Sequence, residues 1–181
     1  RSYSILAGIL VGEGDLKKAE FFLKKSLEIK PKDINALVNL ACVLKDSGNP
    51  KSAEKFLKDA LEINPSYEFA LTNLGAVLNE LEKFDEGEKC LRKALSINSS
   101  SPMALNNLGN ILSNKKKNKE AELCYRKAIE IKSDFYLAYS NLGSLLSKQG
   151  NLLEAEKYTE KAINFNPKFE LAYVNLGSIK I

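Results

Sequence analysis

Apolar and small residues recur along the chain with the spacing of amphipathic helices. Between residues 34 and 67 there are two stripes with i, i+3/i+4 and i+7 spacing, which is the period of a helix with one buried face. The first stripe consists of Ala36, Leu37, Leu40, Ala41, Val43 and Leu44. The second consists of Ala53, Phe56, Leu57, Ala60 and Leu61. Because Gly48-Asn49-Pro50 separates the stripes, the pattern predicts two helices joined by a short turn.

The same pattern returns every 34 residues, the separation of Asn39 from Asn73. An Asn-Leu pair followed by Ala or Gly marks each return, at 39–41, 73–75, 107–109, 141–143 and 175–177. This period predicts repeat units at 1–33, 34–67, 68–101, 102–135 and 136–169, with the first helix of a truncated sixth unit at 170–181. Because one helix pair cannot bury its apolar faces alone, the units are expected to stack into an elongated solenoid.

These residues resemble the tetratricopeptide repeat, a helix-turn-helix unit of 34 residues, over essentially the whole chain. The Leu-Gly pair, the recurring alanines and the closing prolines Pro31, Pro65 and Pro167 all match that family. The resemblance implies an all-α fold, a right-handed superhelical α-solenoid. It also implies that the first helix of each unit lines a concave groove.

Two of the turns inside the units depart from this pattern. Most turns carry a glycine suited to a left-handed backbone conformation, followed by a residue that can cap the next helix: Gly14-Asp15, Gly48-Asn49 and Gly150-Asn151. Glu82 and Lys116 replace that glycine in the third and fourth units. We therefore predict looser or re-phased turns there, with Asp85 and Asn118 as substitute helix caps.

The composition excludes most catalytic chemistry. The 181 residues include no histidine, which removes Ser-His and Cys-His nucleophile pairs, a histidine base and histidine metal ligands. Cys42, Cys90 and Cys124 are an odd number without a CxxC spacing, which supports neither a disulfide framework nor a zinc site. No phosphate-binding glycine loop occurs. We predict no catalytic residue, no metal site and no cofactor, and a protein that is not an enzyme.

The charge and hydropathy also narrow the choice of partners. The net charge of +4 is well below that of a typical nucleic-acid binder, and no apolar run is long enough to span a membrane. The cysteine usage favours a reducing compartment, and we expect a cytoplasmic protein. Because the chain begins with Arg1 instead of Met, we expect it to be a piece of a longer protein.

The groove implied by the resemblance is polar and nearly uncharged. Its most regular feature is a row of asparagines, one in each first helix from the second unit onward: Asn39, Asn73, Asn107, Asn141 and Asn175. Two further asparagines, Asn106 and Asn110, are expected on the same surface. Apolar residues are expected along one edge: Phe69, Met103, Leu137 and Leu171. These eleven residues are the predicted peptide-binding site.

A carboxamide places a hydrogen-bond donor beside an acceptor, as a peptide group does. Helices pack ~8–10 Å apart, so successive asparagines would meet about every third residue of an extended peptide. The row resembles the asparagine ladder in the repeat array of the O-linked N-acetylglucosamine transferases. The alternative is structural, in which each asparagine only bonds a neighbouring helix.

Three functions follow from this groove. We favour a protein-interaction scaffold that binds an extended peptide or partner segment through the asparagine row. A substrate-recruiting array from a larger enzyme such as a glycosyltransferase is a second interpretation. Self-association through the truncated C-terminal repeat, where Ile179 and Ile181 have no covering helix, is a third. A clamp for chaperone C-terminal carboxylates is not favoured, because the groove positions carry no Lys or Arg.

Overall fold

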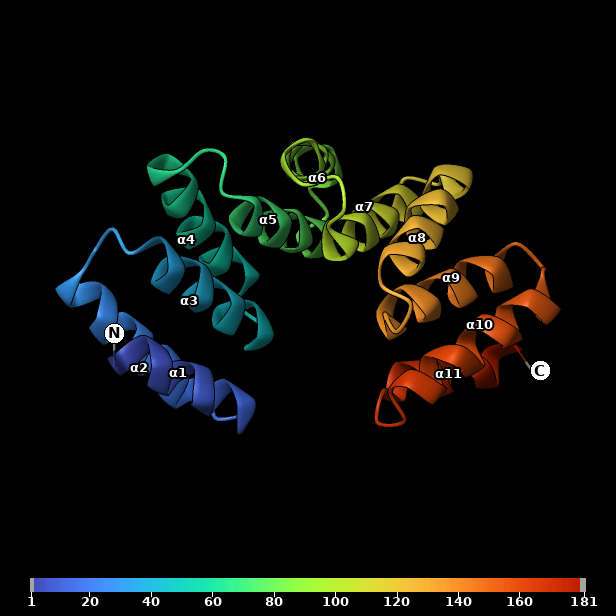
Figure 1. Ribbon diagram of the computed structural model, residues 1–181, viewed down its shortest axis with the longest axis horizontal. Helices are drawn as coiled ribbons and strands as arrows, with labels where there is room; N and C mark the ends of the chain where they lie inside the picture. Colours follow the sequence, from blue (N-terminus) through green and yellow to red (C-terminus); the bar gives the residue numbers. More distant parts are fainter. Residues whose placement is uncertain (1, 180–181) are drawn as a thin grey trace. The chain divides into compact units, whose positions relative to one another are not determined.

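The computed structural model describes residues 2–179, with side-chain surroundings from residue 3 onward. Within that range the chain forms eleven α-helices and no strand (Figure 1). The helices are α1 (Ser2–Gly12), α2 (Leu16–Ile29), α3 (Ile34–Asp46), α4 (Pro50–Ile63), α5 (Glu68–Glu80), α6 (Phe84–Ile97), α7 (Pro102–Asn114), α8 (Asn118–Ile131), α9 (Tyr136–Lys148), α10 (Leu152–Phe165) and α11 (Glu170–Ile179). The predicted all-α fold is confirmed.

Consecutive helices pair into hairpins. The pairs α1/α2, α3/α4, α5/α6, α7/α8 and α9/α10 each pack together, and each lies inside one of the expected 34-residue units. The exact boundaries of the units stay a prediction. Two isoleucines of the last repeat were expected to have no covering helix. Ile179 of α11 is buried, and Ile181 lies outside the described residues.

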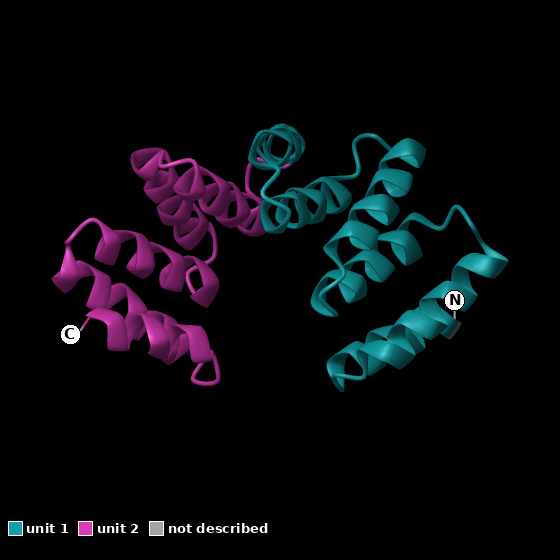
Figure 2. Ribbon diagram, turned by 180° about the vertical axis from the view of Figure 1, so that it is seen from behind, with its two compact units in different colours: residues 1–97 teal, residues 98–181 magenta. Residues whose placement is uncertain are grey.

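The hairpins group into two larger compact units, each made of several repeats (Figure 2). From here on, the first unit means residues 1–97 and the second unit means residues 98–181. In the first unit, α2 packs on α3 and α4 packs on α5. In the second unit, α8 packs on α9 and α10 packs on α11. The second helix of one hairpin thus covers the first helix of the next, which buries the apolar stripe of each helix against its neighbours.

Small residues let the two helices of a hairpin approach closely. Ala41 and Ala53, from α3 and α4, are both fully buried. A Cβ atom added to Gly143 of α9 would clash with the side chain of Thr159 in α10 and lie 3.1 Å from the carbonyl oxygen of Ala155. This glycine is therefore required by the packing of the hairpin.

Replacing Gly143 with alanine should lower the free energy of unfolding by about 1–3 kcal/mol, because the added methyl overpacks the α9/α10 contact. Gly177→Ala in α11 is the matched control, since a Cβ there meets nothing within 4 Å. That change should be neutral or stabilise by up to about 1 kcal/mol through helix propensity. Urea unfolding of the two variants measures both values. Equal changes in stability would show that the α9/α10 contact does not require a glycine at position 143.

Side chains at the predicted caps support two of the turns. Asp15 accepts a hydrogen bond from the Lys18 backbone N–H at 3.1 Å, and Asn49 accepts one from Ser52 at 3.3 Å. Asn151 occupies the cap of α10 without such a bond; its Nδ2 donates to Glu154 instead. The glycine before each of these residues has positive φ, as expected.

The predicted loosening of the turns at Glu82 and Lys116 is wrong. Glu82 has φ 58° and Lys116 has φ 61°, so both adopt the left-handed conformation that glycine adopts at Gly48 (φ 77°). The closing hydrogen bond is also kept, since the N–H of the next residue donates to a helix carbonyl at 2.8 Å in all three turns. The packing of the flanking helices therefore outweighs the steric cost of positive φ. α8 begins directly at Asn118, with Lys117 in the capping position, and α6 begins at Phe84.

Glu82→Gly and Lys116→Gly should each stabilise the protein by about 0.5–1 kcal/mol, because glycine removes left-handed strain of about 1–2 kcal/mol at some cost in chain entropy. Gly48→Ala is the reverse control and should destabilise. Chemical unfolding tests this, and a loss of stability in both glycine variants would contradict it.

Candidate functional site

The predicted site lies on the first helices of the hairpins. In the second unit, α9 contacts both α7 and α11, so three first helices lie side by side. In the first unit, α3 contacts α5 in the same way. The predicted residues of each unit therefore lie on neighbouring helices, and each unit is described by itself.

Two asparagines of the second unit are held by hydrogen bonds across neighbouring helices. The Nδ2 of Asn141 donates to Oδ1 of Asn106 at 2.9 Å, and Nδ2 of Asn175 donates to Oγ of Ser140 at 3.0 Å. Both acceptors are buried and stand 35 residues earlier in the chain. Within residues 3–179, the Oδ1 atoms of Asn141 and Asn175 accept no hydrogen bond.

Asn73 of the first unit is oriented differently because its neighbour is apolar. The residue 35 positions before it is Val38, which has no side-chain acceptor. Asn73 instead donates from Nδ2 to the carbonyl oxygen of Phe69 at 2.8 Å, and its Oδ1 accepts a weak hydrogen bond from the Cys42 thiol at 3.4 Å. Asn39 is exposed, and its side chain forms no hydrogen bond in the described part of the chain.

The remaining predicted residues fall into two groups. Asn106 is only 3% exposed, so it supports Asn141 instead of presenting its own amide on the surface. Asn110 is half-buried and accepts a hydrogen bond from the Tyr125 hydroxyl at 2.8 Å. Asn107 and Leu137 are half-buried, whereas three apolar residues of the expected edge are exposed: Phe69, Met103 and Leu171.

The cysteines offer no activated nucleophile. Cys42 is half-buried, and burial raises the pKa of its thiol. Cys90 and Cys124 are also half-buried, and neither forms a disulfide. No group of three or more His, Cys, Asp or Glu residues is placed to hold a metal ion, and no helix is long and apolar enough to cross a membrane, among residues 2–179. The face offers amide hydrogen bonds and apolar contacts.

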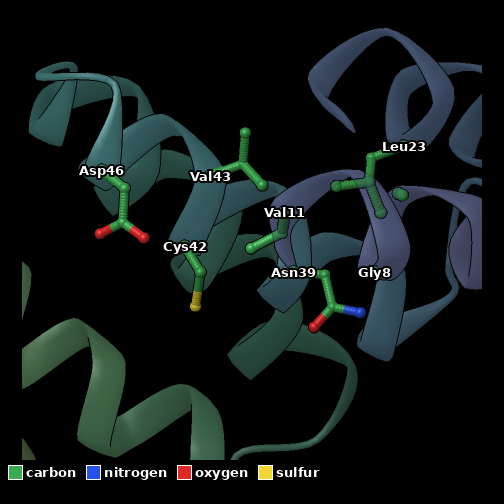
Figure 3. A pocket seen from close by; sticks show the side chains of 8 residues that line it. Gly8, Val11, Leu23, Asn39, Cys42, Val43 and Asp46 are labelled. Atoms are coloured by element: carbon green, nitrogen blue, oxygen red, sulfur yellow. The ribbon is translucent and has the colours of Figure 1, made fainter. Parts of the chain in front are cut away.

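One feature of the first unit was not predicted from the sequence. A pocket of about 170 Å³ opens between α1, α2 and α3 (Figure 3). It is lined by Ala7, Gly8, Val11, Leu23, Asn39, Cys42, Val43 and Asp46. The signal in the sequence is Gly8, because the residue 34 positions later, Cys42, has a side chain.

The bond between Asn141 and Asn106 predicts a measurable coupling. Asn141→Ala should lower the free energy of unfolding by about 1–3 kcal/mol, because the buried Oδ1 of Asn106 loses its donor. In a double-mutant cycle, the variant with both Asn141→Ala and Asn106→Ala should lose less free energy of unfolding than the two single variants lose together. Asn39→Ala is the control and should be neutral within about 0.5 kcal/mol. Additive losses in the two single variants would show that the hydrogen bond contributes nothing to the free energy of unfolding.

Comparison with known proteins identifies the repeat. Three family models, each described as tetratricopeptide repeat, match residues 10–78, 67–134 and 124–157. Together they extend over most of the hairpins described above. Among curated proteins, no sequence matches this chain.

Solved structures with the same fold span nearly the whole chain. A thermophilic repeat protein of Thermus thermophilus is 20% identical with a TM-score of 0.90, covering 99% of this chain and 98% of that one. MamA is 26% identical with a TM-score of 0.69, covering 90% and 95%. YrrB, described as having an unusual peptide-binding site, is 24% identical with a TM-score of 0.64, covering 95% and 89%. At these identities the likeness to the Thermus protein and to YrrB concerns the fold alone.

Proposed function

Because the chain belongs to the tetratricopeptide repeat family, we propose that it is a protein-interaction scaffold whose first helices hold an extended segment of a partner protein. The repeats and the similar structures support the scaffold in general terms. The finer proposal is that the asparagine row binds the main chain of the partner. It concerns Asn39, Asn73, Asn107, Asn141 and Asn175.

The proposal is supported best by the hydrogen bonding of the side-chain amides of Asn141 and Asn175. One N–H of each amide is used to hold the side chain against the preceding first helix. The carbonyl oxygen and the second N–H of each amide have no partner among the described residues. Each amide is thus preorganised, so a bound peptide group would gain two hydrogen bonds at little cost in side-chain entropy.

The spacing between successive asparagines of the row suits an extended ligand. Neighbouring helices in a packed array stand ~8–10 Å apart, and an extended chain rises ~3.3 Å per residue. Successive asparagines within a unit would therefore contact about every third residue of the segment. Main-chain contacts of this kind bind with little dependence on sequence.

The exposed apolar residues would add a modest side-chain preference. Phe69 in the first unit and Met103 and Leu171 in the second project from the same first helices. Burial of apolar surface contributes roughly 25 cal/mol per Å², so even shallow contacts would favour apolar residues in the ligand. Peptide binding on this fold is described for YrrB, which is an analogy at the level of the fold.

A display library of random twelve-residue peptides provides the ligand for a test. Peptides selected on the unmodified chain should bind the Asn141→Ala/Asn175→Ala variant at least about tenfold more weakly, because each lost hydrogen bond costs about 0.5–1.5 kcal/mol. Isothermal titration calorimetry measures the affinities. Asn164→Ala is the matched control, since Asn164 is exposed on the second helix α10.

Circular dichroism of each variant, at a temperature well below its unfolding midpoint, confirms that the compared proteins are folded. Unchanged affinity of the folded double variant would make the asparagines purely structural. Failure to select any peptide on the unmodified chain would argue against an extended-segment scaffold altogether.

A further inference from the structure

The pocket between α1, α2 and α3 has an apolar floor and a polar mouth. Ala7, Leu23 and Val43 are buried at its base. Gly8 and Asn39 are exposed at its opening, and the labelled side chains of Asn39 and Cys42 both extend from α3 in Figure 3. An apolar cavity of about 150 Å³ accommodates a group as large as benzene, so the volume of about 170 Å³ matches one aliphatic side chain.

The pocket exists because one side chain is missing. A Cβ added to Gly8 would meet nothing within 4 Å. The residues at the equivalent place in later repeats, at intervals of 34, all have a side chain: Cys42, Ala76, Asn110 and Ser144. The first repeat therefore differs from the others in leaving this space open beside Asn39, a member of the asparagine row.

The mouth of the pocket carries one carboxylate, that of Asp46. Asp46, at the C-terminal end of α3, lines the pocket and pairs with Lys45 at 3.1 Å. Asp46 is the last residue of α3, where the helix dipole favours a cation.

We propose that this pocket is a specificity subsite that receives one aliphatic side chain of the bound segment, with a Lys or Arg beside it that contacts Asp46. The inference rests on the scaffold function, and it adds the side-chain chemistry that the asparagine row does not select. The aliphatic group replaces water against Leu23 and Val43. The adjacent cation contacts the carboxylate of Asp46 at the mouth.

Three short probes separate these contributions: acetyl-Leu-Lys-amide, acetyl-Leu-Glu-amide and acetyl-Gly-Lys-amide. Methyl resonances of Val11, Leu23 and Val43 report on the lining during an NMR titration of the full chain. Acetyl-Leu-Lys-amide should shift them with a dissociation constant on the order of millimolar, as expected for so few contacts. The Leu-Glu probe should bind at least about threefold more weakly. The Gly-Lys probe should cause no saturable shift.

Three variants test whether the Leu-Lys probe binds in this pocket. Gly8→Leu fills the pocket from its own helix and should weaken the Leu-Lys probe by about tenfold or more. Gly177→Leu adds the same side chain where a Cβ also meets nothing, and it should leave binding unchanged. Asp46→Asn should keep the response to leucine and remove the difference between the Leu-Lys and Leu-Glu probes.

Equal binding of the Leu-Lys probe to the Gly8→Leu variant and the unmodified chain would overturn the subsite, and so would a saturable response to the Gly-Lys probe. These outcomes are separable from failure of the scaffold. Selected library peptides that lose affinity on Asn141→Ala/Asn175→Ala but not on Gly8→Leu would retain the scaffold and reject the pocket. A pocket that binds the Leu-Lys probe in a chain that selects no peptide would reject the scaffold alone.

Discussion

The two helices of each hairpin lie in close contact, and this contact controls how the rest of the chain packs. Ala41 and Ala53 are fully buried, and Gly143 lies where even a methyl group would strike the facing helix. Because the hairpins are this tight, their larger apolar side chains project toward the neighbouring hairpin, where they are buried in turn. The same contact enforces the turn geometry, including positive φ at Glu82 and Lys116.

The hairpin packing also determines how the asparagines can act. With the first helices adjacent, Asn141 and Asn175 reach an acceptor on the preceding first helix, at Asn106 and Ser140. The equivalent residue for Asn73 is Val38, which has no side-chain acceptor, so the Nδ2 of Asn73 donates to its own helix instead. Asn141 and Asn175 thus each have a structural hydrogen bond and retain polar atoms for a ligand, so the structural and binding interpretations of the row are compatible.

Much of the fold could be predicted from the sequence because helical periodicity and a 34-residue repeat are local signals. The helices of the second repeat and the caps at Asp15 and Asn49 follow from them directly. The turns at Glu82 and Lys116 could not be predicted, since tertiary packing outweighs the local preference for glycine. Burial of Asn106 depends on Asn141 in the next repeat, and the pocket at Gly8 depends on three helices at once.

The most direct measurement is a crystal structure of the chain with a selected peptide. We expect the peptide to lie extended across first helices, with a backbone N–H of the peptide about 2.7–3.2 Å from Oδ1 of Asn141 or Asn175. The hydrogen bonds from these asparagines to Asn106 and Ser140 should be retained. A peptide bound on the second helices, or one that makes no hydrogen bond to either amide, would show that the asparagine row does not bind the partner.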